Sequence, residues 1–364
     1  MFCALAIAMV GSHELIANAA ANREPGFVYV MTNLPGGNSI AVFRQAESGD
    51  LTAGGTFVTG GLGNGAMPDP LASQGGLILL GEFLFAVNAG SNDVSVLRIQ
   101  GSELVLVSKV ASGGIRPTSV AVHRDLLYVV NAGSGTIVGF RVGADGDLKK
   151  LLDSTRTLTA GPSADPAQIS FSPDGRLLIV PEKAPNLIDV FTVNDAGLTE
   201  GPFPNVSNGE TPFGFDFDGA GHLIVSEAFG GAPNAGALSS YAVSPDGSLS
   251  VISASVPDEQ TAPCWVVTTK NGAFAYTTNT GSASISSYHV LSDGALELLD
   301  PVAATTTPGG SPIDMALDRS GRFLYAQVNV TGTISGFRVR DDGSLTPISD
   351  TSGIPPFAQG IAAR

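Results

Sequence analysis

Two glutamates stand at the ends of short apolar runs, where a strand would deliver a carboxylate to the edge of a sheet. Glu182 ends the run LLIVPE, and Glu227 ends the run LIVSE. A carboxylate that lies near other carboxylates has a raised pKa and can take a proton from water as a general base. We therefore predict that Glu227 and Glu182 are the catalytic residues of a hydrolytic site.

Other groups that could bind a polar substrate lie next to prolines or close to these glutamates. They offer cations, carboxylates, an amide and an indole, which together could hold and polarise a carbonyl compound. The predicted substrate-binding residues are Arg116, Asp165, Gln168, Lys183, Trp265 and Asp314. Asp69, which precedes Pro70, is a further carboxylate of this kind. For any one residue the alternative is that it closes a turn or binds a channel water, so only the whole group predicts a site.

Several motifs of other chemistries are absent from the sequence. No Gly-x-Ser-x-Gly nucleophile elbow occurs. Cys3 and Cys264 are too few for a disulfide framework and lack the spacing of zinc ligands, and His222 and His289 are isolated. We predict no metal and no cofactor. A calcium ion held by carboxylates and carbonyls is the alternative that the sequence leaves open.

The candidate residues belong to a repeated unit. An aliphatic residue, two spacers and a large apolar residue recur in seven copies, which begin 43 to 54 residues apart. The copies are Ile40/Phe43, Val94/Leu97, Ile137/Phe140, Ile188/Phe191, Leu238/Tyr241, Ile285/Tyr288 and Ile334/Phe337. A turn followed by Leu comes after each copy, often as Asp-Gly-Ser-Leu, and Asp-Gly is a strong hairpin signal. This period is typical of the blades of a β-propeller.

Each unit predicts four short strands, of which the second is apolar at every position. In the third copy the first three are residues 119–123, 126–130 and 136–142. A strand without alternation is covered on both faces, as in blades packed around a ring. The chain enters at a second strand, residues 27–31, and leaves near Ile361 on what should be a first strand. We predict an all-β fold, a closed seven-bladed β-propeller over residues 27–364 whose N- and C-terminal strands share one blade.

The repeat also predicts where the candidate residues meet. A proline precedes each first strand, and a polar residue ends each second strand. Because consecutive strands are antiparallel, the start of the first and the end of the second lie on the same face of the ring. We therefore expect the candidate residues to surround one mouth of the central channel, a usual place for ligands.

Composition and the first residues bear on partners and location. The chain of 364 residues has 18 basic and 33 acidic residues, a net charge of −15 that disfavours nucleic acid and anionic membranes.

Residues 1–20 hold a short apolar run and an Ala17-Asn18-Ala19 pattern, and they predict a signal peptide; a buried first strand is the alternative. The apolar run is too short to span a bilayer. We expect a secreted or periplasmic protein that is a monomer.

The sequence resembles the seven-bladed propeller lactonases, which include 6-phosphogluconolactonase and carboxymuconate cyclase. The resemblance is carried by FSPDGRLLIVPE (171–182), by GRFLYAQVN (321–329) and by the repeated DGSL turns. It implies functional positions at a histidine-rich segment before the FSPDG strand, at an Arg-His pair one blade later and at a following glutamate. In this chain the first segment is Asp165-Pro166-Ala167-Gln168, and the second is Thr211-Pro212-Phe213-Gly214. Only the glutamate is retained, as Glu227.

Two functions follow from these residues. The first is hydrolysis of a non-phosphorylated lactone or related ester, with Glu227 or Glu182 as the base and Arg116, Lys183 or amides polarising the carbonyl. The second is a non-catalytic exported propeller that binds a small molecule or a protein partner at the same mouth. The absence of the family's His and Arg, which would stabilise an oxyanion or a phosphate, keeps the second open.

Overall fold

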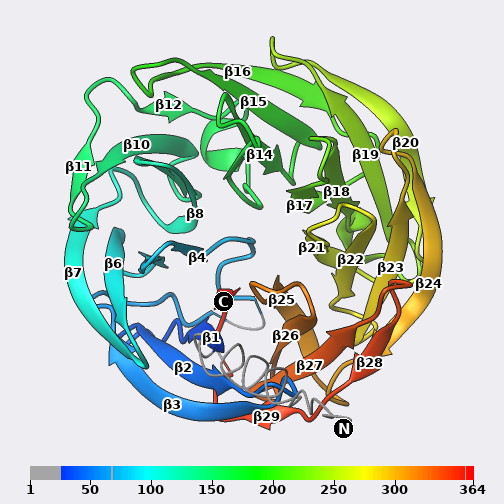
Figure 1. Ribbon diagram of the computed structural model, residues 1–364. Helices are drawn as coiled ribbons and strands as arrows, with labels where there is room; N and C mark the ends of the chain where they lie inside the picture. Colours follow the sequence, from blue (N-terminus) through cyan, green and yellow to red (C-terminus); the bar gives the residue numbers. More distant parts are fainter. Residues whose placement is uncertain (1–25, 67–68, 357) are drawn as a thin grey trace, which may run out of the picture.

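A ring of seven sheets makes up the structure, a computed structural model that describes residues 26–66, 69–356 and 358–364. Each sheet is antiparallel, and its strands lie side by side in order from the centre of the ring to the rim (Figure 1). Among the described residues the helical segments are two short 3-10 turns, Gly161–Ser163 and Phe229–Gly231. The predicted all-β, seven-bladed propeller is therefore confirmed. The predicted leader, residues 1–20, lies outside the described residues.

The first four blades each hold their strands in the same order from the inside outward. Blade 1 has β30 (Ile361–Ala363), β1 (Gly26–Met31), β2 (Ser39–Gln45) and β3 (Leu51–Val58). Blade 2 has β4 (Leu77–Leu80), β5 (Phe83–Asn88), β6 (Asp93–Gln100) and β7 (Glu103–Ala111). Blade 3 has β8 (Pro117–His123), β9 (Leu126–Asn131), β10 (Thr136–Val142) and β11 (Leu148–Lys150), with β12 (Arg156–Thr157) also on β10. Blade 4 has β13 (Ser170–Phe171), β14 (Leu177–Glu182), β15 (Leu187–Val193) and β16 (Thr199–Val206).

The other three blades repeat this order. Blade 5 has β17 (Pro212–Phe217), β18 (Leu223–Glu227), β19 (Ala237–Val243) and β20 (Leu249–Pro257). Blade 6 has β21 (Pro263–Thr268), β22 (Phe274–Asn279), β23 (Ser284–Val290) and β24 (Leu296–Thr305). Blade 7 has β25 (Ser311–Leu317), β26 (Phe323–Asn329), β27 (Thr333–Val339) and β28 (Leu345–Pro347), with β29 (Thr351–Ser352) also on β27.

The ring closes through β30, as the sequence predicts. Val28, Tyr29 and Val30 of β1 pair with Ala363, Ala362 and Ile361 of β30. The Met31 amide also donates to the Gly360 carbonyl at 2.9 Å. Blade 1 is therefore made from both ends of the chain, so its sheet keeps the four strands of the other blades.

The hydrophobic core lies between the blades. Every residue of β9 is buried, which confirms that the second strand is covered on both faces. Tyr128 of β9 packs with Leu178 and Val180 of the next blade in one cluster. The Tyr128 hydroxyl donates to the Gly197 carbonyl in a turn of that blade at 2.8 Å. Gly197 has φ of +80°, so the Asp-Ala-Gly turn that the sequence predicts brings a carbonyl against the neighbouring blade.

In the part of the chain that the structure describes, no helix is long and apolar enough to cross a membrane.

Candidate functional site

The start of the first strand and the end of the second strand meet at one face of the ring. Pro117 pairs with Asn131, Pro166 with Glu182, Pro212 with Glu227, and Pro263 with Asn279. The residue before each of these prolines has positive φ: Arg116 (54°), Asp165 (48°), Thr211 (57°) and Ala262 (56°). Non-glycine residues adopt this conformation at a cost of about 1 kcal/mol or more, so the ring repeats a strained corner at the predicted mouth.

Glu227 and Glu182 lie at this face, but their carboxylates are turned toward the connection that enters their own blade. The Glu227 carboxylate accepts hydrogen bonds from the Gly209 amide (2.8 Å) and the Ser255 hydroxyl (2.6 Å). The Glu182 carboxylate accepts from the Thr159 amide (2.8 Å) and the Ala160 amide (3.0 Å). Both glutamates are fully buried, so their observed contacts are with their own chain. Their catalytic role stays a prediction.

Glu182 also faces a second acid. The Thr159 amide that donates to Glu182 donates to the Asp189 carboxylate as well, at 2.8 Å. Burial, together with the neighbouring Asp189, raises the pKa of Glu182 to about 8.

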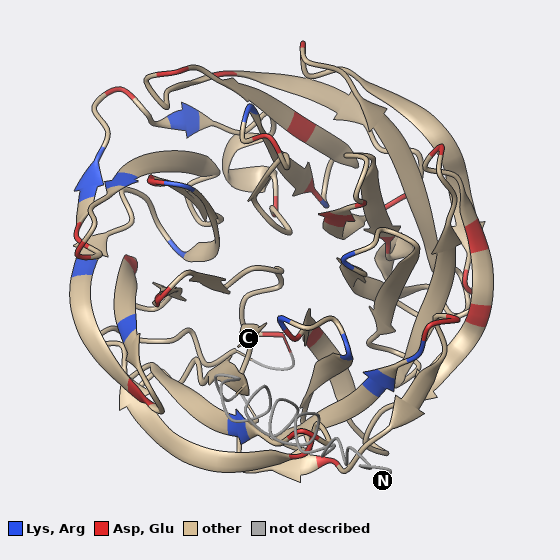
Figure 2. Ribbon diagram, viewed as in Figure 1, with Lys and Arg blue, Asp and Glu red and all other residues tan. Residues whose placement is uncertain are grey.

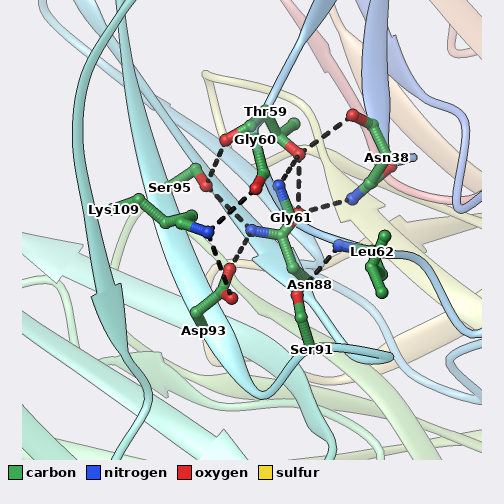
Figure 3. A network of polar contacts seen from close by, with 10 residues as sticks. All are labelled: Asn38, Thr59, Gly60, Gly61, Leu62, Asn88, Ser91, Asp93, Ser95 and Lys109. Atoms are coloured by element: carbon green, nitrogen blue, oxygen red, sulfur yellow. Dashed lines mark hydrogen bonds and ion pairs between the residues drawn. The ribbon is translucent and has the colours of Figure 1, made fainter.

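Asn88 shows the same arrangement with an amide in place of a carboxylate. It ends β5, and its side chain accepts from Asn38 (2.9 Å) and from Thr59 (2.8 Å) (Figure 3). It donates to Asp93 (2.6 Å) and Ser95 (2.8 Å) of the next strand. The polar residue at the end of a second strand thus anchors the preceding connection in blades 2, 4 and 5 alike.

The mouth brings together a buried ammonium and two carboxylates. Lys183 Nζ lies 3.5 Å from the half-exposed Asp165 carboxylate and donates to the Ala72 carbonyl at 2.5 Å. It also lies 4.5 Å from the centre of the Phe213 ring, a favourable position for a cation. Burial lowers the pKa of Lys183, and the charges of Asp165 and Asp69 oppose that shift. Lys183 therefore links Asp165 electrostatically to Asp69.

Asp69 and a third carboxyl group of this mouth, Asp314, have pKa values above their ordinary range. Burial raises the pKa of Asp69 to about 6, against the opposing charge of Lys183 and a hydrogen bond from the Ala72 amide (2.8 Å). Burial likewise raises the pKa of Asp314 to about 8, and its charge interacts with that of Asp69. We call Asp69, Asp165, Lys183 and Asp314 the mouth cluster. Asp69, Lys183 and Asp314 have shifted pKa values, and such a concentration of shifted groups is typical of functional sites.

A stretch that we call the connection segment, residues 69–76 between β3 and β4, enters the middle of the ring beside this cluster (Figure 1). The Gln74 amide donates to the Ala167 carbonyl of blade 4 at 2.8 Å. The Gln74 side chain donates to the Val266 carbonyl of blade 6 (2.8 Å) and accepts from its amide (3.0 Å). The Gln359 side-chain amide, just before β30 of blade 1, donates to the Ser73 carbonyl at 3.0 Å. The connection segment therefore joins blades across the central channel, at the mouth where the sequence predicts the candidate residues.

Gln168 and Trp265, both predicted to bind substrate, contact the protein's own chain. Gln168 donates to the Phe215 carbonyl (3.1 Å) and accepts from the Phe215 amide (2.8 Å), so both ends of its amide are engaged. Trp265 is fully buried, with its ring 5.1 Å from that of Phe213 and its Nε1 donating to the Ser73 carbonyl (3.4 Å). Trp265 therefore packs against Phe213, whose aromatic ring contacts the Lys183 ammonium.

Arg116 stands at an equivalent corner one blade away. Its amide donates to the Asn92 side chain at 2.6 Å, and its own side chain is partly buried. Of the predicted substrate-binding residues, the structure therefore groups Asp165, Lys183 and Asp314 in the mouth cluster. It places Trp265 behind that cluster and Gln168 between two blades.

Asp69 is a carboxylate that the sequence already predicts at the mouth, whereas Phe213 belongs to the mouth although no role is predicted for it from the sequence. The signal for Asp69 is its position before Pro70, which matches Asp165 before Pro166. No signal marks Phe213, because an apolar residue in a first strand reads as core. Among the residues described, no three His, Cys, Asp or Glu side chains come together as a metal site.

The geometry and the repeat agree with a known family of proteins. The family model described as lactonase, seven-bladed β-propeller, matches residues 81–228, 225–313 and 248–357. This chain belongs to that lactonase family. A search of curated proteins finds no match.

Solved structures with the same fold share little sequence with this chain. A protein from Lactobacillus plantarum superimposes with a TM-score of 0.76 at 18% identity, over 94% of this chain and 100% of its own. A proposed 6-phosphogluconolactonase from Bacteroides fragilis gives 0.74 at 19%, over 94% and 98%. The periplasmic gluconolactonase of Pseudomonas aeruginosa gives 0.70 at 16%, over 93% and 99%. At these identities the likeness shows the fold alone.

The two positions at which the resemblance implies an Arg-His pair are occupied by Phe213 and Gly214. Phe213 contacts the Lys183 ammonium instead of supplying a cation. A Cβ at Gly214 would lie 2.2 Å from Gln74 Oε1 and 2.5 Å from the Cys264 carbonyl. A histidine at position 214 therefore does not fit beside the connection segment.

Proposed function

We propose that this member of the family hydrolyses a neutral lactone or related ester at the mouth cluster. The observation that carries the proposal is the Lys183 ammonium held between Asp165 and Asp69 in a chain of the lactonase family. With a pKa of about 6, Asp69 is mostly ionised at neutral pH and has the basicity of a general base that takes a proton from water.

In this reaction the activated water attacks the lactone carbonyl, and the ring C–O bond breaks to give a hydroxy acid. Lys183 or Arg116 stabilises the negative charge that develops on the carbonyl oxygen. The carboxylates of the mouth cluster and the aromatic ring of Phe213 favour an uncharged substrate over a phosphorylated one, because Asp165 and Asp69 already face the Lys183 ammonium and would repel a phosphate. Glu227 and Glu182, the bases expected from the sequence, are the competing assignment.

The test is proton release from purified protein mixed with neutral and phosphorylated lactones. Asp69→Asn should lower kcat by about a hundredfold or more, the usual contribution of a positioned base, and should remove the acidic limb of the pH profile. Glu227→Gln, at the end of β18, tests the competing assignment. If Asp69→Asn keeps the rate and Glu227→Gln loses it with the fold intact, the competing assignment is correct. If no lactone releases protons, the hydrolytic proposal is wrong.

The second candidate is a non-catalytic binding protein. It is favoured by the number of predicted site groups that already bind their own chain, namely Lys183 at Ala72, Gln168 at Phe215 and Trp265 at Ser73. A ligand that prefers the folded state raises the melting temperature, so a shift with a small molecule that is recovered unchanged would support binding alone.

We also propose that the protein is exported and monomeric. The leader pattern in residues 1–20 supports export, and the similar Pseudomonas structure is that of a periplasmic enzyme. Cell fractionation tests the location. Light scattering tests the oligomeric state, and a mass of two chains would overturn the monomer.

A further inference from the structure

The face of the ring opposite the mouth holds a groove between blades 6 and 7. Its volume is about 270 Å³, and it is formed by the turn after β21, the turn after β25 and the turn after β27. Its lining includes Lys270, Arg322, Arg340 and Asp341. Three of them are exposed cations and one is a carboxylate.

The three cations lack close carboxylate partners. Lys270, Arg322 and Arg340 take part in none of the ion pairs within 4.0 Å that the described residues form. Arg322 Nε donates to the Ser320 hydroxyl at 3.2 Å, and Arg340 Nε donates to the Thr346 hydroxyl at 2.8 Å. These hydroxyl contacts orient the guanidinium groups. Hydrogen bonds from Ser344 lower the pKa of Asp342, and the charge of Arg340 adds to that shift, so Arg340 has a carboxylate in electrostatic range but none in ion-pair contact.

The repeat supplies an internal comparison for Arg340. In six blades a turn between the third and fourth strands closes with a hydrogen bond from a glycine amide to the carbonyl three residues earlier. The residues that accept these bonds are Ala46, Gly143, Asn194, Ser244, Leu291 and Arg340. Only the last is charged, so fold geometry does not require a cation at this position.

The turn between the first and second strands gives a matching comparison for Arg322. In blade 4 the turn closes from Gly175 to Ser172, and Arg176 follows; in blade 7 it closes from Gly321 to Asp318, and Arg322 follows. Arg176 has Asp174 at 3.8 Å, whereas the position of Asp174 is taken by Ser320 beside Arg322. The carboxylate beside the arginine side chain in blade 4 is thus replaced by a hydroxyl in blade 7. The carboxylate of that turn, Asp318, stands in the place of Ser172 and accepts from the Arg322 amide (2.9 Å) and the Ser320 hydroxyl (2.6 Å).

Lys270 completes the groove from blade 6. A Cβ at Gly321 would touch the Lys270 chain at 3.8 Å, so the lysine stem lies across this glycine and brings its charge toward blade 7. Figure 2 shows several blue segments around blade 7, at the lower right of the ring. In a chain with a net charge of −15, the groove lining itself is basic, with Lys270, Arg322 and Arg340 against Asp341.

We propose that the groove between blades 6 and 7 binds a small dianion, with Lys270, Arg322 and Arg340 as its ligands. Arginine and lysine donate charge-assisted hydrogen bonds to phosphate and carboxylate oxygens. The groove is too small, and the surrounding protein too acidic, for an extended polyanion. The site lies on the opposite face from the mouth cluster and does not depend on the proposed hydrolysis.

Calorimetric titration of the full chain with inorganic phosphate, and separately with succinate, tests this site at low ionic strength. We expect one site per chain for at least one probe, and about tenfold weaker binding in Arg340→Gln, the loss typical of one charge-assisted contact. Lys270→Gln should act in the same direction. Arg176→Gln is the matched control and should leave the affinity unchanged.

The three exposed substitutions should not change the melting temperature without anion, which separates lost binding from lost folding. A preference for phosphate or for succinate then identifies the oxyanion geometry. The proposal is overturned if neither probe binds, if Arg340→Gln weakens binding by less than about threefold, or if Arg176→Gln weakens it as much. Binding of nucleic acid or anionic vesicles through the same three residues would also overturn it.

Discussion

Replacing Gln168 by alanine should destabilise the ring, because its amide completes an open strand edge. β17 is the innermost strand of blade 5, and the amide and carbonyl of Phe215 bond to Gln168. Phe215 is 1% exposed and Gln168 is 7% exposed, so water has little access to either partner. Leaving a buried donor and a buried acceptor without partners costs about 1 to 3 kcal/mol each, so we expect a loss of about 2 to 5 kcal/mol.

The free energy of unfolding is measured in urea by the fluorescence of Trp265, the single tryptophan of the chain. Gln168→Met removes the same hydrogen bonds while nearly filling the volume, so it should lose almost as much and exclude a simple cavity effect. The exposed Gln100→Ala is the control and should change little. A loss below about 1 kcal/mol for Gln168→Ala, or an effect seen only in ligand affinity, would refute the bridging role and return Gln168 to substrate binding.

Three further predictions concern burial. The folded-state pKa of Glu182 is about 8, above its ordinary 4.5, so the folded state binds this proton more tightly than the unfolded state does. The free energy of unfolding should therefore fall as the pH rises from about 4.5 to about 8. Glu182→Gln should flatten this fall in urea titrations at each pH, and an unchanged slope would contradict the prediction. Gly135→Ala should lower the melting temperature more than Gly101→Ala does. Both glycines have positive φ, but a Cβ at Gly135 would lie 1.9 Å from the Gly161 carbonyl, whereas a Cβ at Gly101 would meet nothing within 4 Å. Equal losses would show that the backbone conformation alone sets the loss of stability. Burial raises the pKa of Cys264 to about 12, so in a Cys3→Ser background the thiol should stay unreactive toward a disulfide reagent until urea unfolds the chain, and rapid labelling of the native protein would disprove its burial.

The fold could be predicted from the sequence because each blade corresponds to one copy of a repeated sequence pattern. Seven copies of one pattern specify the blades, and glycines such as Gly49, Gly146 and Gly343 have the positive φ that the predicted turns require. The entry of the chain at a second strand also predicted that β30 would complete blade 1. Each of these features depends on residues close in sequence or on counting strands.

The direction of the site side chains could not be read in the same way. The pairing shifts register just after the proline in several first strands, as between Pro212 and Phe215 and between Pro263 and Trp265. Such an irregularity changes the face to which first-strand side chains such as Phe213 point. The contact of Glu227 with Gly209 depends instead on the path of the connection before the blade, which the strand pattern does not show. The connection segment was equally hidden, since its partners lie as far along the chain as Val266 and Gln359.

The pairing of β30 with β1 has a consequence for how the protein is made. Residues 361–363 leave the ribosome long after residues 26–31, so β1 has no inner neighbour during most of synthesis. Throughout that interval its inner edge is a template for misplaced strands, and blades 2 to 7 have to form as an open arc before the last pairing brings the two ends together. Deleting the final four residues would leave every other blade intact in composition and still yield a molecule prone to self-association.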